Sequence, residues 1–193
     1  MIISKQLSPL LHFISSVTNN DVLILRGYEQ MPEKYSNDVD IFLPEELLEV
    51  LIEKFNASDV YVVKNIDQRL GLLKLEVLAC DEAIKLDILY GFYYVGLEYY
   101  DKTRVWHEKR RHRSGAFAIP QPQAELTISL FKEILHNGRI RSDKLAGFQN
   151  VDHATYQKTI SRYISVNDYK AVESSVRNGT LELLAYRRLF IVN

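Results

Sequence analysis

Apolar residues at the start of the chain recur with helical spacing, so residues 5–18 are predicted to form a helix with one buried face. The next run, VLILR at 22–26, is short and largely β-branched or aliphatic, which predicts a strand buried on both faces. Gly27 then lets the chain leave the strand sharply. The helical stripe consists of Leu7, Leu10, Leu11, Ile14 and Val17.

A second strand is predicted at 38–43, where DVDIFL begins by alternating acidic and apolar residues and ends before Pro44. Proline suits the first position of a helix, and the residues that follow place leucines on one helical face. Further strands are predicted at 60–66, 70–79 and 83–91. This order, a helix, two strands, a helix and a meander, predicts an α+β fold with a mixed or antiparallel sheet and flanking helices.

The pattern changes after about residue 115, where strand-like runs cease and Pro120 and Pro122 indicate a stiff connector. Helical spacing dominates from there to the C-terminus, which predicts a small helical bundle. We therefore expect an α/β domain over 1–115 and a helical C-terminal domain over 116–193. The expected helices of the second domain cover 123–137, 152–163, 168–177 and 180–191.

Composition narrows the class of protein. With 24 basic and 25 acidic residues the formal net charge is -1, so no global field attracts nucleic acid, and a nucleic-acid partner is not expected. Cys80 is the single cysteine and cannot form an internal disulfide, which favours a reducing, cytoplasmic location. No apolar run approaches the roughly 18 residues of a membrane span, and the N-terminus lacks the features of a signal peptide. The oligomeric state is left open.

Three acidic residues are candidates for metal-dependent chemistry. Asp38 and Asp40 are two residues apart on a predicted strand, so their side chains share one face and could hold one ion. Asp87 lies alone inside the apolar strand of IKLDILYG and needs a partner. Such triplets are common by chance in an acidic-rich chain, but the strand context and the later acid favour a functional interpretation. Carboxylates of this kind suit Mg²⁺.

The series VLILRG, NDVDIFLPEE and AIKLDILYG resembles the nucleotidyltransferase superfamily, whose pattern is a glycine turn, an acid-x-acid strand and an acid on a later strand. These features correspond to Gly27, to Asp38 with Asp40, and to Asp87. The sequence is most similar to small nucleotidyltransferases of bacterial surface polysaccharide gene clusters, which carry a leucine-arginine-x-tyrosine segment before the acids; here it is residues 25–28. The resemblance covers residues 21–91.

This resemblance implies a nucleotidyltransferase-like fold in which Asp38, Asp40 and Asp87 are catalytic and bind Mg²⁺ or Mn²⁺. It further implies transfer of a nucleoside monophosphate from a nucleoside triphosphate to a hydroxyl of a sugar, phosphosugar or protein acceptor, in surface polysaccharide biosynthesis. Active members commonly carry Gly-Ser or Gly-Gly at the turn, whereas this chain has Arg26 and Gly27. Arg26, Gly27 and Lys132 on the first C-terminal helix are the candidate nucleotide-binding residues.

Two alternatives stay open. A catalytically inactive nucleotide-binding or assembly module could retain the fold and lose turnover through the altered turn. A toxin-like enzyme that adenylylates a protein or tRNA is compatible with the chain length. Lys85 shares the strand face of Asp87 and is a candidate for pairing with it, while the basic run KRRHR at 109–113 is typical of a solvated loop.

Overall fold

The computed structural model describes residues 1–19, 22–160 and 166–179. The chain forms two compact units. The first, called the sheet unit here, comprises Met1–Phe92 and Asp101–Gln121, and the second, the helical unit, comprises Tyr93–Tyr100 and Pro122–Asn193. The predicted boundary between residues 115 and 116 thus falls inside the second segment of the sheet unit.

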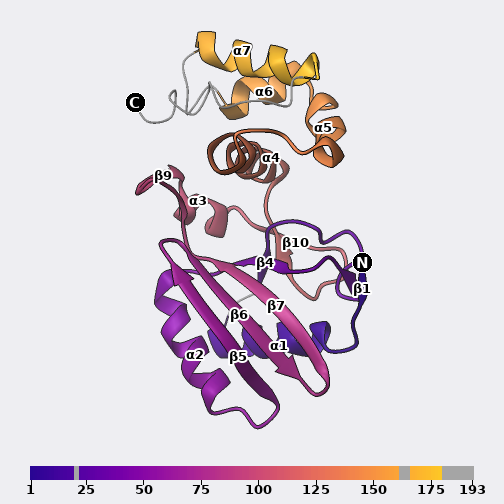
Figure 1. The fold of residues 1–193 in the computed structure, drawn as a ribbon, viewed down its shortest axis with the longest axis vertical. Coiled ribbons are helices and arrows are strands. Elements are labelled where there is room, and N and C mark those ends of the chain that lie inside the picture. The colour runs from indigo at the N-terminus through magenta and orange to yellow at the C-terminus, as the bar shows by residue number, and fades with distance from the viewer. Residues whose placement is uncertain (20–21, 161–165, 180–193) are drawn as a thin grey trace. The chain divides into compact units, whose positions relative to one another are not determined.

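The sheet unit is built on a seven-stranded sheet with the order β10-β11-β2-β4-β7-β6-β5 (Figure 1). Two neighbouring pairs, β11 with β2 and β4 with β7, are parallel, and the other pairs are antiparallel. The sheet is therefore mixed, and the predicted α+β fold with flanking helices is confirmed. The strands are β2 (Leu23–Ile24), β4 (Val39–Phe42), β5 (Tyr61–Arg69), β6 (Leu72–Ala79), β7 (Glu82–Leu89), β10 (Arg110–Arg111) and β11 (Ala118–Ile119).

Two tight hairpins set the register of the long strands. Residues 70 and 71 join β5 to β6, and Gly71 takes the left-handed backbone (φ 76°) that such a turn requires. Cys80, which is exposed, and Asp81 join β6 to β7. Along β6 every second residue is buried, from Leu73 to Ala79, so one face of the strand is apolar and the other carries Lys74 and Glu76 between Leu72 and Leu78.

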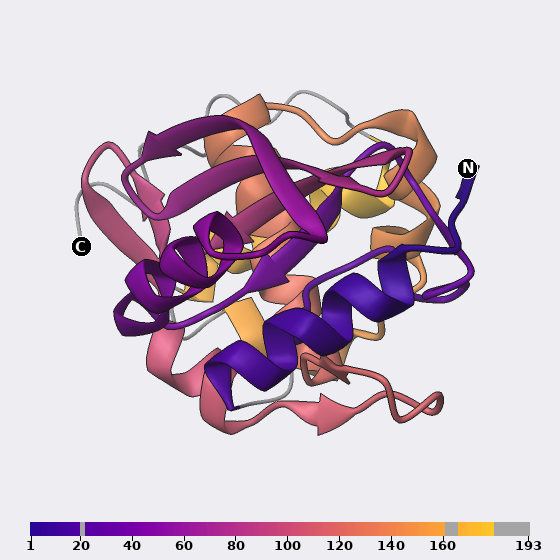
Figure 2. The ribbon, with the colours of Figure 1, turned by 90° about the horizontal axis from the view of Figure 1, so that it is seen from below.

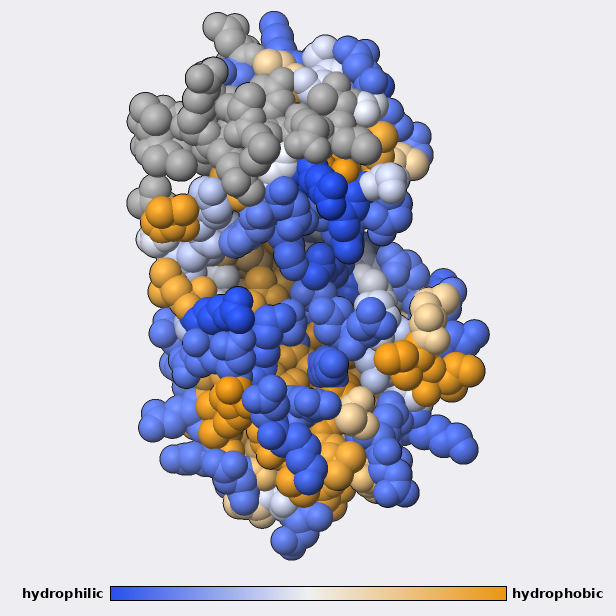
Figure 3. Space-filling model, in the orientation of Figure 1, coloured by the Kyte–Doolittle hydropathy of each residue, from blue (hydrophilic) through white to orange (hydrophobic). Residues whose placement is uncertain are grey.

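Helices α1 (Leu7–Thr18) and α2 (Leu48–Asn56) lie on the same side of the sheet (Figures 1 and 2). Both present a stripe of buried leucines to the apolar face, as the helical spacing predicts. A short 3₁₀ turn, η1 (Glu45–Leu47), leads into α2 after Pro44. The opposite face of the sheet carries hydrophilic side chains mixed with apolar ones (Figure 3). The core includes Leu10, Leu11, Leu51, Phe55, Val77, Ile84 and Leu86.

Short elements depart from the sequence-based expectation. The segment after Gly27, for which no strand is predicted, contains β3 (Lys34–Tyr35), which pairs with β1 (Ile2–Ile3). The expectation that strand runs cease after about residue 115 is wrong, because β11, at Ala118–Ile119, adds to β2. Two-residue strands carry no detectable alternation, and their positions depend on neighbours distant in sequence. The basic run at 109–113 supplies β10, and helix α3 (Lys102–His107), capped by the Asp101 side chain, precedes it.

The helical unit has its own apolar core. The helices expected at 123–137, 152–163 and 168–177 correspond to α4 with a π-helical turn, to α6 and to α7, while residues 161–163 and the helix expected at 180–191 lie outside the described residues. Helix α5 was not predicted, because it has few apolar residues. No helix within the described ranges is long and apolar enough to cross a membrane. Strand β8 (Phe92–Tyr94) begins at the last residue of the first sheet-unit segment. The other elements are β9 (Leu97–Tyr100), α4 (Pro122–Lys132), η2 (Glu133–Asn137), α5 (Ser142–Gln149), α6 (His153–Ile160) and α7 (Val166–Arg177).

Candidate functional site

Four charged residues form one row across the polar face of the sheet. Asp40 on β4 is the register partner of Asp87 on β7, Asp87 is the partner of Lys74 on β6, and Lys74 is the partner of Asp67 on β5. Register partners on adjacent strands lie about 5 Å apart and share a face. The two predicted acids Asp40 and Asp87 are therefore immediate neighbours, on the side of the sheet opposite α1 and α2.

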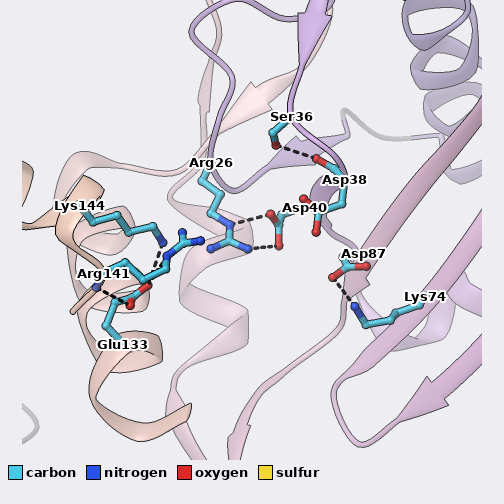
Figure 4. A network of polar contacts seen from close by, with 9 residues as sticks. All are labelled: Arg26, Ser36, Asp38, Asp40, Lys74, Asp87, Glu133, Arg141 and Lys144. Carbon is cyan, nitrogen blue, oxygen red and sulfur yellow. Dashed lines mark hydrogen bonds and ion pairs between the residues drawn. The ribbon is translucent and has the colours of Figure 1, made fainter. Parts of the chain in front are cut away.

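Asp40 is held by Arg26. The guanidinium donates from Nε to Oδ2 at 2.6 Å and from Nη2 to Oδ1 at 2.8 Å (Figure 4). Only 7% of the Asp40 side chain is exposed, and such a two-pronged contact is among the stronger ion-pair geometries. Pairing of β2 with β4 aligns the two residues, since the Leu25 amide donates to the Asp40 carbonyl at 2.9 Å.

Asp87 is paired with Lys74, whose Nζ lies 2.8 Å from Oδ2. The expectation that Lys85 pairs with Asp87 is wrong: Lys85 forms no ion pair with a described residue. The reason is register, because Lys74 lies directly across from Asp87 while Lys85 lies across from Glu76. Lys74 remains 42% exposed, so its ammonium can leave Asp87 without disrupting the core.

Asp38 immediately precedes β4 and is half-buried. Its main-chain carbonyl accepts a hydrogen bond from Ser36 Oγ at 3.3 Å, but no described residue bonds its carboxylate. Asp38 and Asp87 line the same pocket, which has a volume of about 390 Å³. Asp40 is not among the residues that line it. The structure thus brings two of the predicted acids to one cavity and places the third beside them, bound to Arg26.

Most of the pocket wall comes from residues that sequence reasoning missed. The alternation within β6 puts Lys74 and Glu76 on the polar face, but only the two-residue turns at both ends of β6 reveal their neighbours. The pairing register of β5, β6 and β7 was therefore the signal needed to predict these pocket residues. The pocket is lined by Asn37, Asp38, Asn65, Asp67, Lys74, Leu75, Glu76, Lys85 and Asp87.

Nucleotide binding by Arg26, Gly27 and Lys132 stays a prediction. Gly27 has a left-handed backbone (φ 70°), in agreement with the sharp exit expected after β2. A residue with a Cβ would be strained at this angle. Lys132 is half-buried in the last turn of α4 and belongs to the helical unit, whereas Arg26 and Gly27 belong to the sheet unit.

The donor set fits one Mg²⁺ ion better than two. Magnesium takes oxygen ligands, usually one or two carboxylates completed by water and substrate phosphate, and Asp38 and Asp87 supply two carboxylates to a common pocket. Asp40 already accepts from Arg26 with both oxygens. Within residues 1–19, 22–160 and 166–179, no three His, Cys, Asp or Glu side chains are grouped as a metal centre. Metal binding by all three acids remains a prediction.

Charge in the pocket favours a cation. Four carboxylates, those of Asp38, Asp67, Glu76 and Asp87, and two ammonium groups, those of Lys74 and Lys85, line the pocket. Asp67 is also ion-paired with Arg69 at 2.8 Å, so the formal balance is four negative against three positive charges. An anionic ligand such as a triphosphate would enter against this field unless a divalent cation accompanied it.

No protein-family model matches the chain, and no curated protein matches it. A comparison with solved structures finds one described as "Crystal structure of putative nucleotidyltransferase from H. pylori", with a TM-score of 0.38 and 11% sequence identity. The match covers 98% of this chain and 93% of the other. The mixed sheet and flanking helices are consistent with a nucleotidyltransferase-like fold, but a likeness this distant carries no argument for activity.

Proposed function

We propose that this protein is a nucleotidyltransferase that binds a nucleoside triphosphate with Mg²⁺ on the polar face of its sheet and transfers the nucleoside monophosphate to a hydroxyl acceptor. The convergence of Asp38 and Asp87 on one pocket, beside Asp40, is the observation that supports this proposal. It agrees with the acid pattern of the superfamily that the sequence resembles. That resemblance favours a role in surface polysaccharide biosynthesis.

Each residue has a defined task in this proposal. Asp38 and Asp87 hold Mg²⁺, which would neutralise charge on the triphosphate when bound. Oδ2 of Asp87 accepts from Lys74, while Oδ1 has no described donor and can take the proton of the acceptor hydroxyl. The acceptor oxygen then bonds to the α-phosphorus, the bond from that phosphorus to the bridging oxygen breaks, and pyrophosphate leaves. Lys74, which lines the same pocket, would contact the phosphates when the nucleotide is bound.

Titration calorimetry with nonhydrolysable ATP, CTP, GTP and UTP analogues tests nucleotide binding, in the presence of Mg²⁺ and then of EDTA. We expect one analogue to bind only with Mg²⁺, and Asp38→Asn and Asp87→Asn to weaken that binding at least about tenfold, since each removes a charged ligand. Asp81→Asn is the matched control, because Asp81 is exposed in the turn at the other end of β7. It should bind like the wild type.

Metal-independent binding, or equal losses in Asp38→Asn and Asp81→Asn, would contradict the proposed site. If none of the four analogues bound to the folded protein, the enzyme proposal itself would fail. Circular dichroism of each variant establishes that the fold is retained. Pyrophosphate release with an acceptor present then measures turnover.

A catalytically silent nucleotide-binding module is the second candidate, and the Arg26–Asp40 ion pair favours it. Arg26 occupies both oxygens of the acid that the resemblance assigns to the metal, at the turn where active members carry glycine and serine. Arg26→Ser would restore the hydroxyl and release Asp40. Nucleotide binding without pyrophosphate release in the wild type, together with turnover in Arg26→Ser, would select this candidate.

A further inference from the structure

We propose that His112 is a pH-sensitive lock: in its neutral form it holds the turn between β10 and β11 closed against the loop that follows β2, and on protonation it releases that turn. His112 directly follows β10, and residues 112–117 lead from there to β11. All the residues involved belong to the sheet unit. The lock is independent of the proposed transfer reaction and would act whether or not the protein binds a nucleotide.

Hydrogen bonds of His112 close the 112–117 turn. Its amide donates to the Phe117 carbonyl at 2.9 Å, and its carbonyl accepts from the Gly115 amide at 2.9 Å. The imidazole adds a third bond, because the Ser114 amide donates to Nδ1 at 3.3 Å. A backbone amide can only donate, so Nδ1 keeps its lone pair and the proton of the neutral ring lies on Nε2.

Aromatic residues hold the same ring in place. It stacks on Phe117, with the ring centroids 4.5 Å apart and the planes 7° apart, and it meets the edge of Tyr28 at 5.9 Å. Only 8% of His112 is exposed. Tyr28 belongs to the loop that follows β2, and Arg113 Nη2 donates to the Glu29 carbonyl of that loop at 3.5 Å. The neutral ring therefore joins the 112–117 turn to this loop.

Protonation of Nδ1 removes the third bond of the turn. An imidazolium ring donates from both nitrogens and has no lone pair left for the Ser114 amide. Ser114 Oγ, 2.9 Å from Nδ1, can change from donor to acceptor, but the amide cannot. His12 makes the opposite kind of bond, because its Nδ1 donates to the Ser8 carbonyl at 2.8 Å. That bond survives protonation, whereas the bond between the Ser114 amide and His112 does not.

Charged groups on both sides of the ring influence how readily it takes a proton. Burial, the largest influence, and the cations of Arg113 and Arg110 lower the pKa of His112 below its ordinary value of 6.5. The carboxylates of Glu29 and Glu33, on the facing loop, raise the pKa by less. The unfolded chain thus binds this proton more readily than the folded chain. The stabilisation by neutral His112 is complete above pH 6.5 and is lost as the pH falls through the lowered pKa.

Proton–nitrogen NMR of the imidazole rings and amide hydrogen exchange test the lock on the intact protein. We expect the His112 ring to carry its proton on Nε2 at about pH 7.5. As the pH falls to about 5, the protection of the Ser114 and Gly115 amides, corrected for the intrinsic exchange rate, should fall about fivefold, because one hydrogen bond of the turn is lost.

His112→Asn separates the titration from the hydrogen bond. The asparagine side-chain carbonyl can accept from the Ser114 amide, as in an Asx turn, but does not titrate, so protection should change by less than about twofold over the same pH range. His12→Asn is the matched control, because His12 is exposed on α1 and its bond to Ser8 survives protonation. It should show the same fall in protection as the wild type.

A proton on Nδ1 of His112 at neutral pH would overturn the proposal, and so would a pKa of His112 at or above 6.5. Both are measured on the wild type and therefore decide the question even if His112→Asn does not fold. An equal fall in protection in the wild type and in His112→Asn would also overturn the proposal, because the pH effect would then not come from His112. Loss of the effect in His12→Asn would assign it to the wrong histidine.

Discussion

The acids of the helical unit and those of the sheet unit are compensated to different extents. In the helical unit, Glu133 begins the π-helical turn η2 and is 1% exposed. It accepts hydrogen bonds from Lys144 Nζ at 2.9 Å and from the Arg141 amide at 3.3 Å (Figure 4). Asn137 Nδ2 donates a third, at 3.0 Å. In the sheet unit, Asp87 has a single half-exposed lysine, and Asp38 has no described partner.

The number of partners around each carboxylate distinguishes an acid that stabilises the fold from an acid that is available to a ligand. A buried carboxylate is costly unless its oxygens are satisfied, and the donors around Glu133 achieve this within the unit. Such a closed network leaves nothing for a ligand to bind. The acids of the sheet face border a pocket and retain acceptor capacity, so a cation or a hydroxyl can still join them. Asp40 is an intermediate case, because it lies beside the pocket but both of its carboxylate oxygens accept hydrogen bonds from Arg26.

Glu133→Gln should give the largest effect of the substitutions considered. Breaking one side of a buried ion pair typically costs about 3–5 kcal/mol, and here it leaves Lys144, 21% exposed, without its counter-charge. We expect the free energy of unfolding in urea to fall by about 3 kcal/mol. Glu76→Gln, the same change on the sheet face, should alter it by less than about 0.5 kcal/mol. Equal losses of unfolding free energy in both variants would contradict the distinction between structural acids and acids available to a ligand.

The pH dependence of stability sharpens this comparison. Burial, the largest single influence, raises the pKa of Glu133, but hydrogen bonds from Lys144 and Asn137 with the Lys144 charge outweigh it and leave the pKa below its ordinary value of 4.5. The unfolded chain therefore binds the proton more readily than the folded one. The stabilisation by Glu133 is complete above pH 4.5 and is lost as the pH falls below it.

Urea midpoints measured from about pH 6 to about pH 3 should thus decline in the wild type, and Glu133→Gln should flatten part of that decline. Other acids also contribute, so the difference between the two proteins is the quantity to follow. A constant difference over this range would mean that the ionised form of Glu133 contributes nothing.

Arg26→Ser should have an intermediate effect on stability. It leaves Asp40, which is 7% exposed, without its two-pronged partner, and an unsatisfied buried acceptor costs about 1–3 kcal/mol. We expect the lower half of that range, because a side chain at the edge of the pocket can recruit water. Added Mg²⁺ should recover part of the loss if Asp40 can join a metal. Recovery by K⁺ at equal ionic strength would indicate screening instead.

The sequence contains enough information for the long elements and for the acids, but not for their partners. Periodicity located α1, α2 and β5 to β7, because each buries a regular face. The acids stood out because Asp87 interrupts an apolar strand. Strands such as β11 are fixed by tertiary pairing and leave no local pattern.

Partner identity depends on register. Lys74 lies thirteen residues from Asp87 and meets it only because the turn at Cys80 and Asp81 has two residues. One added residue in that turn would shift the register by one and place Asp87 and Lys74 on opposite faces of the sheet. Arg26 meets Asp40 by a side-chain reach that spacing does not specify. The sequence therefore indicates the acidic residues of the site, whereas the structure shows which of them are paired with a basic residue.

Lys74→Gln should have the smallest effect on stability and a distinct effect on metal binding. Pairs as exposed as Lys74 with Asp87 contribute about 0.2–1 kcal/mol, so the urea midpoint should barely move. Because the ammonium competes with a cation for Asp87, its removal should tighten Mn²⁺ binding about twofold to fivefold, as measured by electron paramagnetic resonance without nucleotide. Lys64→Gln, on the exposed bulge of β5, is the control and should change neither quantity. Lys74→Gln could instead destabilise the protein as much as Glu133→Gln and leave the Mn²⁺ affinity unchanged. That result would contradict the proposal, because the Lys74–Asp87 pair would then be structural, like the contacts of Glu133.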